Sequence, residues 1–253
     1  MLRHVSWSSL ALGFLAMASV AHADAVADLR AALVKLSASG PLATTVDVRS
    51  TSHGDDHDKP QQASLRIQVA SDADGLHLTF PPAVLQQATR EAAAHARDKD
   101  LPTPVDDLIG KLTATNVQPM VDFAPTLLHM LDGATLSGQR DETHDGRPAH
   151  LLLFKVPMPP SAGKQMTVKS YTDELKVWLG ADGLPVAVDE KADVHGRKLL
   201  ISIDFSTTSS YALRVIGTRL VAVSRHTEES HSVFGHGGGS AVDATLVPAK
   251  PAG

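Results

Sequence analysis

A long stretch of alternating apolar residues constrains the fold of this chain more than any other feature. Between Met166 and Ser209, apolar side chains recur at every second position in three successive runs: Leu175, Val177 and Leu179; Leu184, Val186 and Val188; Leu199, Ile201, Ile203 and Phe205. Such alternation is typical of β-strands that bury one face. The stretch predicts three long antiparallel strands, joined by tight turns at 181–183 and 195–196.

The remaining segments predict helices and strands of an α+β protein. Asp24–Leu36 carries an apolar stripe at three- and four-residue steps, which is typical of an amphipathic helix. Further strands are expected at 42–49, 64–70, 76–80, 135–143, 149–156, 213–223 and 241–246, and helices at 83–99, 105–112 and 120–131, the last kinked or restarted at Pro125. The predicted fold is a long curved antiparallel sheet, a half-barrel, that wraps one or a few helices and carries a helical insertion at 82–132.

The N-terminus has the pattern of a secretory signal peptide. A positive start at Arg3 and His4 precedes the apolar run Leu10–Val20, and the small-x-small sequence of residues 21–23 follows. These features predict cleavage after Ala23 and export to the periplasm. The apolar run is shorter than the roughly 20 residues that span a bilayer, and we expect no integral membrane span. A retained N-terminal anchor is the alternative interpretation.

Composition narrows the remaining function classes. The chain has no cysteine, which excludes disulfides, thiolate metal sites, a cysteine nucleophile and a lipidated N-terminal cysteine. A net charge of −5 gives no reason to expect nucleic acid or anionic lipid as a partner. We expect a single domain at 24–247, followed by a tail at 248–253.

The sequence offers little support for catalysis. None of the serines lies in a G-x-S-x-G elbow, and the glycine-rich segment 235–239 lacks the ending of a phosphate-binding loop. Acidic residues such as Asp189 and Asp193 are expected at exposed strand positions. We therefore expect no enzyme activity and no cofactor.

Two histidine-containing segments resemble metal sites in composition alone. His53 and His57 lie close to carboxylates, and His226, His231 and His236 recur at steps of five. Steps of five place successive residues of a regular strand on opposite faces. Solvated loops are the favoured interpretation of both segments, and no metal site is predicted.

A curved sheet that faces helices can enclose an apolar cavity, and large or pliable side chains are the candidates for its lining. These ligand-binding candidates are Phe80, Met120, Phe123, Met130, Trp178 and Phe205. The alternative is that each of them fills the core, as most large apolar residues do.

Two short segments carry a resemblance to a known family. Lys176–Pro185 (KVWLGADGLP) resembles a hairpin common in the periplasmic lipoprotein carrier family LolA, and 145–151 (DGRPAHL) resembles the strand before it. The receptor LolB and the N-terminal domain of the regulator RseB share that half-barrel fold. The chain departs from LolA at 64–80, which lacks the family's Arg-Pro-x-x-Phe-Arg-Trp strand, and no lipoprotein-contacting residue is carried over.

The resemblance implies a soluble periplasmic carrier that binds an apolar ligand, such as a lipid acyl chain or a lipoprotein. The first alternative is an interaction or regulatory protein of RseB type with an envelope protein as its partner. The second is a metal-binding protein that uses the histidine segments.

Overall fold

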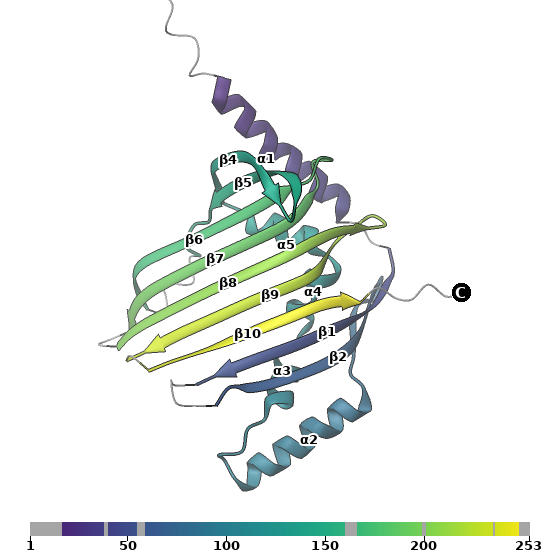
Figure 1. Cartoon of the computed structure of the whole chain (residues 1–253), viewed down its shortest axis with the longest axis vertical. Coiled ribbons are helices and arrows are strands. Elements are labelled where there is room, and N and C mark those ends of the chain that lie inside the picture. The colour runs from purple at the N-terminus through teal and green to yellow at the C-terminus, as the bar shows by residue number, and fades with distance from the viewer. Residues whose placement is uncertain are drawn as a thin grey trace, which may run out of the picture.

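The computed structural model describes residues 17–37, 40–54, 59–159, 166–198, 201–234 and 236–247. Within these ranges the chain forms five helices and ten strands, and every strand joins one curved antiparallel sheet (Figure 1). The sheet is open, because β3 and β4 are its two edges. The α+β prediction with a long curved sheet is confirmed.

The sheet follows the chain closely. Its strands are β1 (Leu42–His53), β2 (Gln61–Asp72), β3 (Gly75–Thr79), β4 (Thr135–His144), β5 (Arg147–Lys155), β6 (Thr167–Leu179), β7 (Pro185–Lys198), β8 (Ile201–Ile216), β9 (Arg219–Val233) and β10 (His236–Val247). They are ordered β3-β2-β1-β10-β9-β8-β7-β6-β5-β4. All neighbours except β1 and β10 are therefore consecutive in sequence.

One helix precedes the sheet and four interrupt it. They are α1 (Met17–Leu36), α2 (Pro82–Arg97), α3 (Pro104–Lys111), α4 (Ala114–Val121) and α5 (Phe123–Met130). Proline begins both α2 and α3, where its missing N–H costs no hydrogen bond. The Glu91 carboxylate of α2 accepts hydrogen bonds from the Val105 and Asp106 amides, at 2.8 and 3.2 Å, and so ties the start of α3 to α2.

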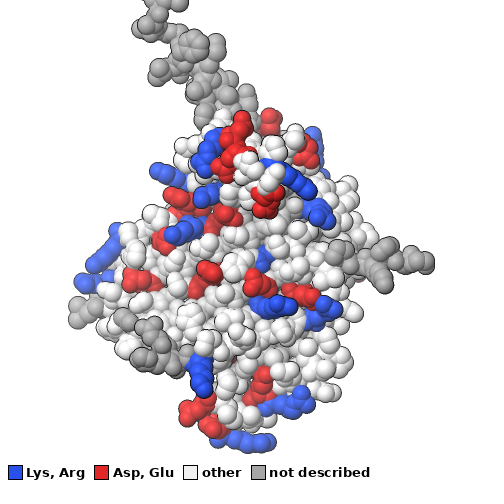
Figure 2. Space-filling view, in the orientation of Figure 1, with Lys and Arg blue, Asp and Glu red and all other residues white. Residues whose placement is uncertain are grey.

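Helices α3, α4 and α5 pack against one face of the sheet, called the helix-side face below; the opposite face is called the outer face (Figure 1). The main core lies between these helices, α1 and the helix-side face, and contains Leu33, Ile67, Phe123, Leu127 and Val188. A second, smaller cluster lies on the outer face, where Trp178 packs with Ala149, Leu151 and Ala187. The outer face also carries interspersed cationic and anionic side chains (Figure 2).

Two predicted hairpin turns are confirmed. Asp145 and Gly146 both have positive φ, 48° and 75°, as a two-residue type I′ hairpin requires. In the turn at 181–183, Gly183 has φ 75° and its amide donates to the Gly180 carbonyl at 2.9 Å. Both turns follow from local residue chemistry alone.

The predicted turn at 195–196 is wrong. Strand β7 continues through both residues to Lys198, with His195 paired to Asp204 and Gly196 paired to Ile203. Gly196 lies close to the neighbouring stretch of chain, because a Cβ at this position would lie 2.5 Å from the sulfur of Met166 and 3.2 Å from the Thr167 carbonyl oxygen. The single strand expected at 213–223 is also wrong, since it turns at Gly217 (φ 62°) between β8 and β9.

The helical predictions need two corrections. The helix expected at 120–131 is two helices that meet at Asp122, whose extended φ of −155° breaks the chain direction. Pro125 lies in the first turn of α5 and causes no kink, because amide N–H groups there have no partner within the helix. Helix α1 begins before Asp24 and crosses the predicted cleavage position, while residues 1–16 lie outside the described residues.

No helix in the described ranges combines the length and apolarity that a membrane span requires. The tail expected at 248–253 lies outside the described residues.

Candidate functional site

A cavity lies between the helix-side face and helices α3 and α4. Its volume is about 300 Å³, at the lower end of the about 300–1,000 Å³ usual for small-molecule sites. The apolar part of its lining is Val46, Val48, Leu108, Leu112, Val117, Met120, Val242 and Ala244. The polar part is Lys111, Asn116, Arg225, Thr227, Glu229 and Ser240. The cavity therefore combines an apolar wall with a charged one.

Strand alternation places the lining residues. Val46 and Val48 of β1 pair with Leu246 and Ala244 of β10, so four apolar side chains meet on the helix-side face. Further along the same strands the helix-side positions become polar, at Ser50, Ser52 and Ser240. Of the polar lining, Ser240 comes from β10, whereas Arg225, Thr227 and Glu229 come from the neighbouring strand β9, and Lys111 and Asn116 come from α3 and α4.

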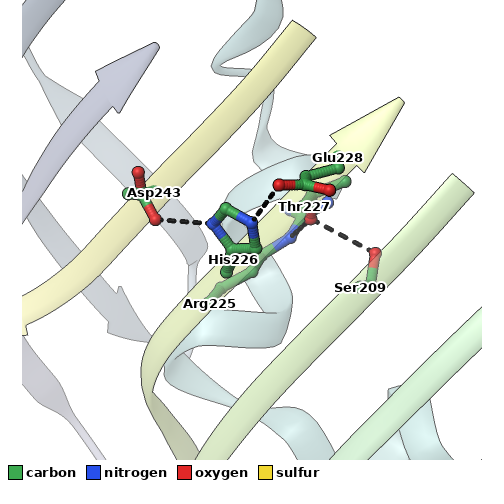
Figure 3. Close-up of polar contacts among 6 residues, drawn as sticks. All are labelled: Ser209, Arg225, His226, Thr227, Glu228 and Asp243. Carbon is green, nitrogen blue, oxygen red and sulfur yellow. Dashed lines mark hydrogen bonds and ion pairs between the residues drawn. The ribbon is translucent and has the colours of Figure 1, made fainter. Parts of the chain in front are cut away.

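Arg225 of β9 is the best-fixed polar residue of this wall. Its Nε donates to Thr227 Oγ1 at 2.9 Å and its Nη1 donates to the Asn116 carbonyl at 3.2 Å. The guanidinium also lies 5.8 Å from the centre of the Tyr211 ring, within range of a cation–π interaction. Ser209 and Thr227 share a hydrogen bond at 3.2 Å beside it (Figure 3). These contacts hold the guanidinium against α4.

Tyr211 links this wall to the main core. Its ring centre lies 4.7 Å from that of Phe123 in α5, with a tilt of 50°. Burial raises the pKa of the Tyr211 hydroxyl, and the nearby Arg225 charge partly opposes that rise. Tyr211 is therefore a neutral, buried platform for the guanidinium.

An acidic pair, the buried Asp173 and the half-buried Glu190, continues the polar row across β6 and β7. Asp173 pairs with Ala192, so Glu190, which pairs with Leu175, is its diagonal neighbour on the helix-side face. Burial raises the pKa of both carboxyl groups, and the Asp173 charge raises that of Glu190 further. Tyr171 Oη donates to Asp173 Oδ2 at 2.8 Å, whereas Asp173 Oδ1 is buried without a partner.

The sequence contained a signal for this pair that the prediction of exposed acids overlooked. Asp173 lies two residues before Leu175 and Glu190 lies two residues after Val188, so both share the phase of the buried side chains. Asp189 and Asp193 have the opposite phase and lie on the outer face. Arg225 gave no comparable signal, because its position depends on the pairing of β9 with β8 and on α4.

The six predicted lining residues fall in different places. Met120 is buried and lines the cavity. Phe123 is fully buried in the main core, and Phe80 and Met130 pack against that core from partly buried positions. Phe205 is 39% exposed on the helix-side face of β8, in phase with Tyr211.

Trp178 lies on the outer face, away from the cavity. Its ring centre is 4.5 Å from that of His144, and its Nε1 donates to Glu142 Oε1 at 2.7 Å. That hydrogen bond is the main cause of the lowered pKa of the Glu142 carboxyl. Trp178 therefore packs on the face of the sheet opposite the cavity.

The second histidine segment is strand rather than loop, which corrects the sequence interpretation. His226 and His231 lie in β9 and His236 lies in β10. His226 and His231 have opposite phases, and the His231 ring packs over Gly238 on the helix-side face. Strand geometry therefore separates these two histidines.

On the outer face His226 lies between two carboxylates (Figure 3). Its Nδ1 is 2.7 Å from Asp243 Oδ1 and its Nε2 is 3.1 Å from Glu228 Oε1, and these hydrogen bonds raise the His226 pKa. His53 ends β1, and His57 lies outside the described residues. Across the described ranges, no group of three or more histidine, aspartate or glutamate residues is placed to hold a metal ion.

No protein-family model matches the chain, and a search of the curated proteins found no significant match.

Proposed function

We propose that this protein is a periplasmic binding or carrier protein for an apolar ligand, such as the acyl chain of a lipid or a lipoprotein. The observation that carries the proposal is the cavity between the helix-side face and helices α3 and α4. Its apolar lining offers an acyl chain contact with β1, β10, α3 and α4 at once. The export pattern of residues 1–23 and the resemblance of Lys176–Pro185 to LolA proteins point to the same function.

Affinity would come from removal of apolar surface from water. Each 100 Å² of acyl surface buried against the lining contributes about 2.5 kcal/mol. Exposed apolar side chains also occur outside the cavity, since Phe205 and Val233 lie on the helix-side face near the ends of β8 and β9.

Access to the cavity would depend on helices α3 and α4. Each is only eight residues long, and too short to be stable by itself. Their position rests on tertiary contacts such as the Glu91 cap of α3 and the Arg225 hydrogen bond to the Asn116 carbonyl. Displacement of these helices would open the cavity while the sheet stays intact.

A dansyl-labelled fatty acid tests the proposal by its fluorescence change on titration with the protein. We expect saturable binding, and we expect Val242→Phe to weaken it by about tenfold or more, or 1.4 kcal/mol. Val242 is half-buried and lines the cavity, so the larger ring would occupy the ligand's space.

Thr245→Phe is the matched control, because Thr245 is exposed on the outer face of the same strand. Its affinity for the probe should equal that of the wild type. Absence of saturable binding, or equal weakening by the two substitutions, would contradict the proposal.

A further inference from the structure

The polar wall of the cavity contains two cations without an ionic partner. Lys111 and Arg225 both line the cavity, and neither forms an ion pair with a carboxylate of the described residues. Arg225 donates its hydrogen bonds to two neutral groups, the Thr227 hydroxyl and the Asn116 carbonyl. A cation beside a partly enclosed cavity normally has a carboxylate or a ligand anion near it.

One carboxylate opposes these cations within the lining. Glu229 belongs to the polar wall, and its side chain forms no ion pair among the described residues. The lining therefore carries two positive charges against one negative charge. Glu190 lies two strands from Arg225 and forms no ion pair with it among the described residues, although the Arg225 charge partly opposes the rise that burial causes in the Glu190 pKa.

The apolar wall and the cationic wall meet in one cavity. Met120 and Val242 line the same space as Arg225 and Lys111. A ligand with an apolar chain and an anionic headgroup complements both walls, whereas a neutral apolar ligand leaves the cations without a partner.

We infer that the cavity binds an anionic amphiphile, with the chain against the apolar wall and a carboxylate-type headgroup at Arg225 and Lys111. This inference rests on the proposed binding function and specifies the ligand's chemical class. Arg225 is held by Thr227, Asn116 and Tyr211, and is therefore preorganised for the headgroup. Lys111, at the end of α3, supplies a second, more exposed charge.

The test compares the dansyl-labelled fatty acid with its methyl ester, which has the same chain and no charge. At low ionic strength, we expect the full-length protein to bind the carboxylate probe about tenfold more tightly than the ester. The ester lacks the charge that makes a charge-assisted hydrogen bond. High salt should reduce the preference, since part of the site is exposed.

Three substitutions locate the effect. Lys111→Gln should reduce the preference for the carboxylate over the ester by several-fold, and Glu229→Gln should increase it. Arg225→Lys should retain part of the preference. Arg225→Met should remove most of it, with circular dichroism used to confirm that the variant folds. If Arg225→Met does not fold, the Lys111 and Glu229 variants decide the question.

The outcomes separate the two proposals. Saturable binding of both probes with equal affinity would overturn the headgroup site and leave the carrier function standing. A preference for the carboxylate that Lys111→Gln and Glu229→Gln leave unchanged would also overturn the site. Absence of binding by either probe would overturn the carrier function together with the site.

Discussion

Replacement of the buried Asp173 by asparagine should stabilise the protein at neutral and alkaline pH. Asp173 is 9% exposed, its Oδ1 has no partner, and Glu190 is its diagonal neighbour. Diagonal neighbours lie about 7–8 Å apart, and two unit charges at that distance repel by roughly 2 kcal/mol at an effective dielectric of about 20. Asp173→Asn removes this repulsion and retains an oxygen that can accept a hydrogen bond from the Tyr171 hydroxyl.

The gain is smaller than the repulsion, because the new amide group needs acceptors of its own, at a cost of about 1 kcal/mol. We expect the free energy of unfolding to rise by about 1–2 kcal/mol at pH 8, and the melting temperature to rise by about 2–8 °C. Urea unfolding followed by circular dichroism measures the first quantity, and calorimetry measures the second.

The pH dependence gives the sharper test. The folded-state pKa of Asp173 is raised, so the folded protein binds the proton more tightly than the unfolded chain does. Wild-type stability from this group is therefore greatest at low pH and falls as pH rises through the folded pKa. The advantage of Asp173→Asn should be largest at pH 8 and shrink as pH is lowered through the raised folded pKa, where the aspartate takes up a proton.

Asp189→Asn is the matched control, because Asp189 lies on the outer face of β7 beside Glu190 in sequence. Its effect should stay within about 0.5 kcal/mol at every pH. A loss of stability in Asp173→Asn at pH 8, or a gain that is the same at pH 8 and pH 4, would refute this account of the acidic pair.

Two further substitutions test contacts on the outer face. The raised pKa of His226 implies that this side chain stabilises the fold fully below about pH 6.5, and that the stabilisation is lost as pH rises through the folded pKa. His226→Gln should therefore lower the free energy of unfolding at pH 6 and leave it almost unchanged at pH 9. The loss of stability should not exceed about 1 kcal/mol, because the His226 side chain is 42% exposed and solvent screens its ion pairs. An equal loss at both pH values, measured by urea unfolding, would disprove the link between His226 protonation and stability. Trp178→Phe removes the hydrogen bond to Glu142 and leaves space in the outer-face cluster, so it should lower the free energy of unfolding by about 2–3 kcal/mol, and a loss under 0.5 kcal/mol would argue against that role.

Features set by neighbouring residues were predictable from the sequence. The Asp145-Gly146 turn was predicted because few residue types readily adopt the positive φ that both turn positions require. The strands around it were predicted from the alternation of apolar and polar residues. Gly196 misled the same reasoning, because this glycine serves contact with Met166 across the sheet rather than a turn.

The segment from His226 to His236 was misread for a different reason. Its polar residues, and the glycines at 237–239 that follow, resemble a loop in composition. Within β9 and β10 they form strands whose faces remain partly exposed and therefore lack apolar alternation. Within the candidate site, Met120 was foreseeable as a large apolar side chain. Arg225 was not, because its role arises from strand register and from a helix more than a hundred residues earlier in the chain.

The pairing of β1 with β10 gives the fold a particular order of assembly. Eight of the nine strand contacts join neighbours along the chain, and each can form as a hairpin or short connection. The ninth joins residues such as Thr45 and Val247, so closing it requires most of the chain to be in place. During synthesis from the N-terminus, β1 would pair with β2 on one edge only, until β10 had been synthesised. Until then the edge of β1 that pairs with β10 would present unpaired backbone N–H and C=O groups, to which a chaperone could bind.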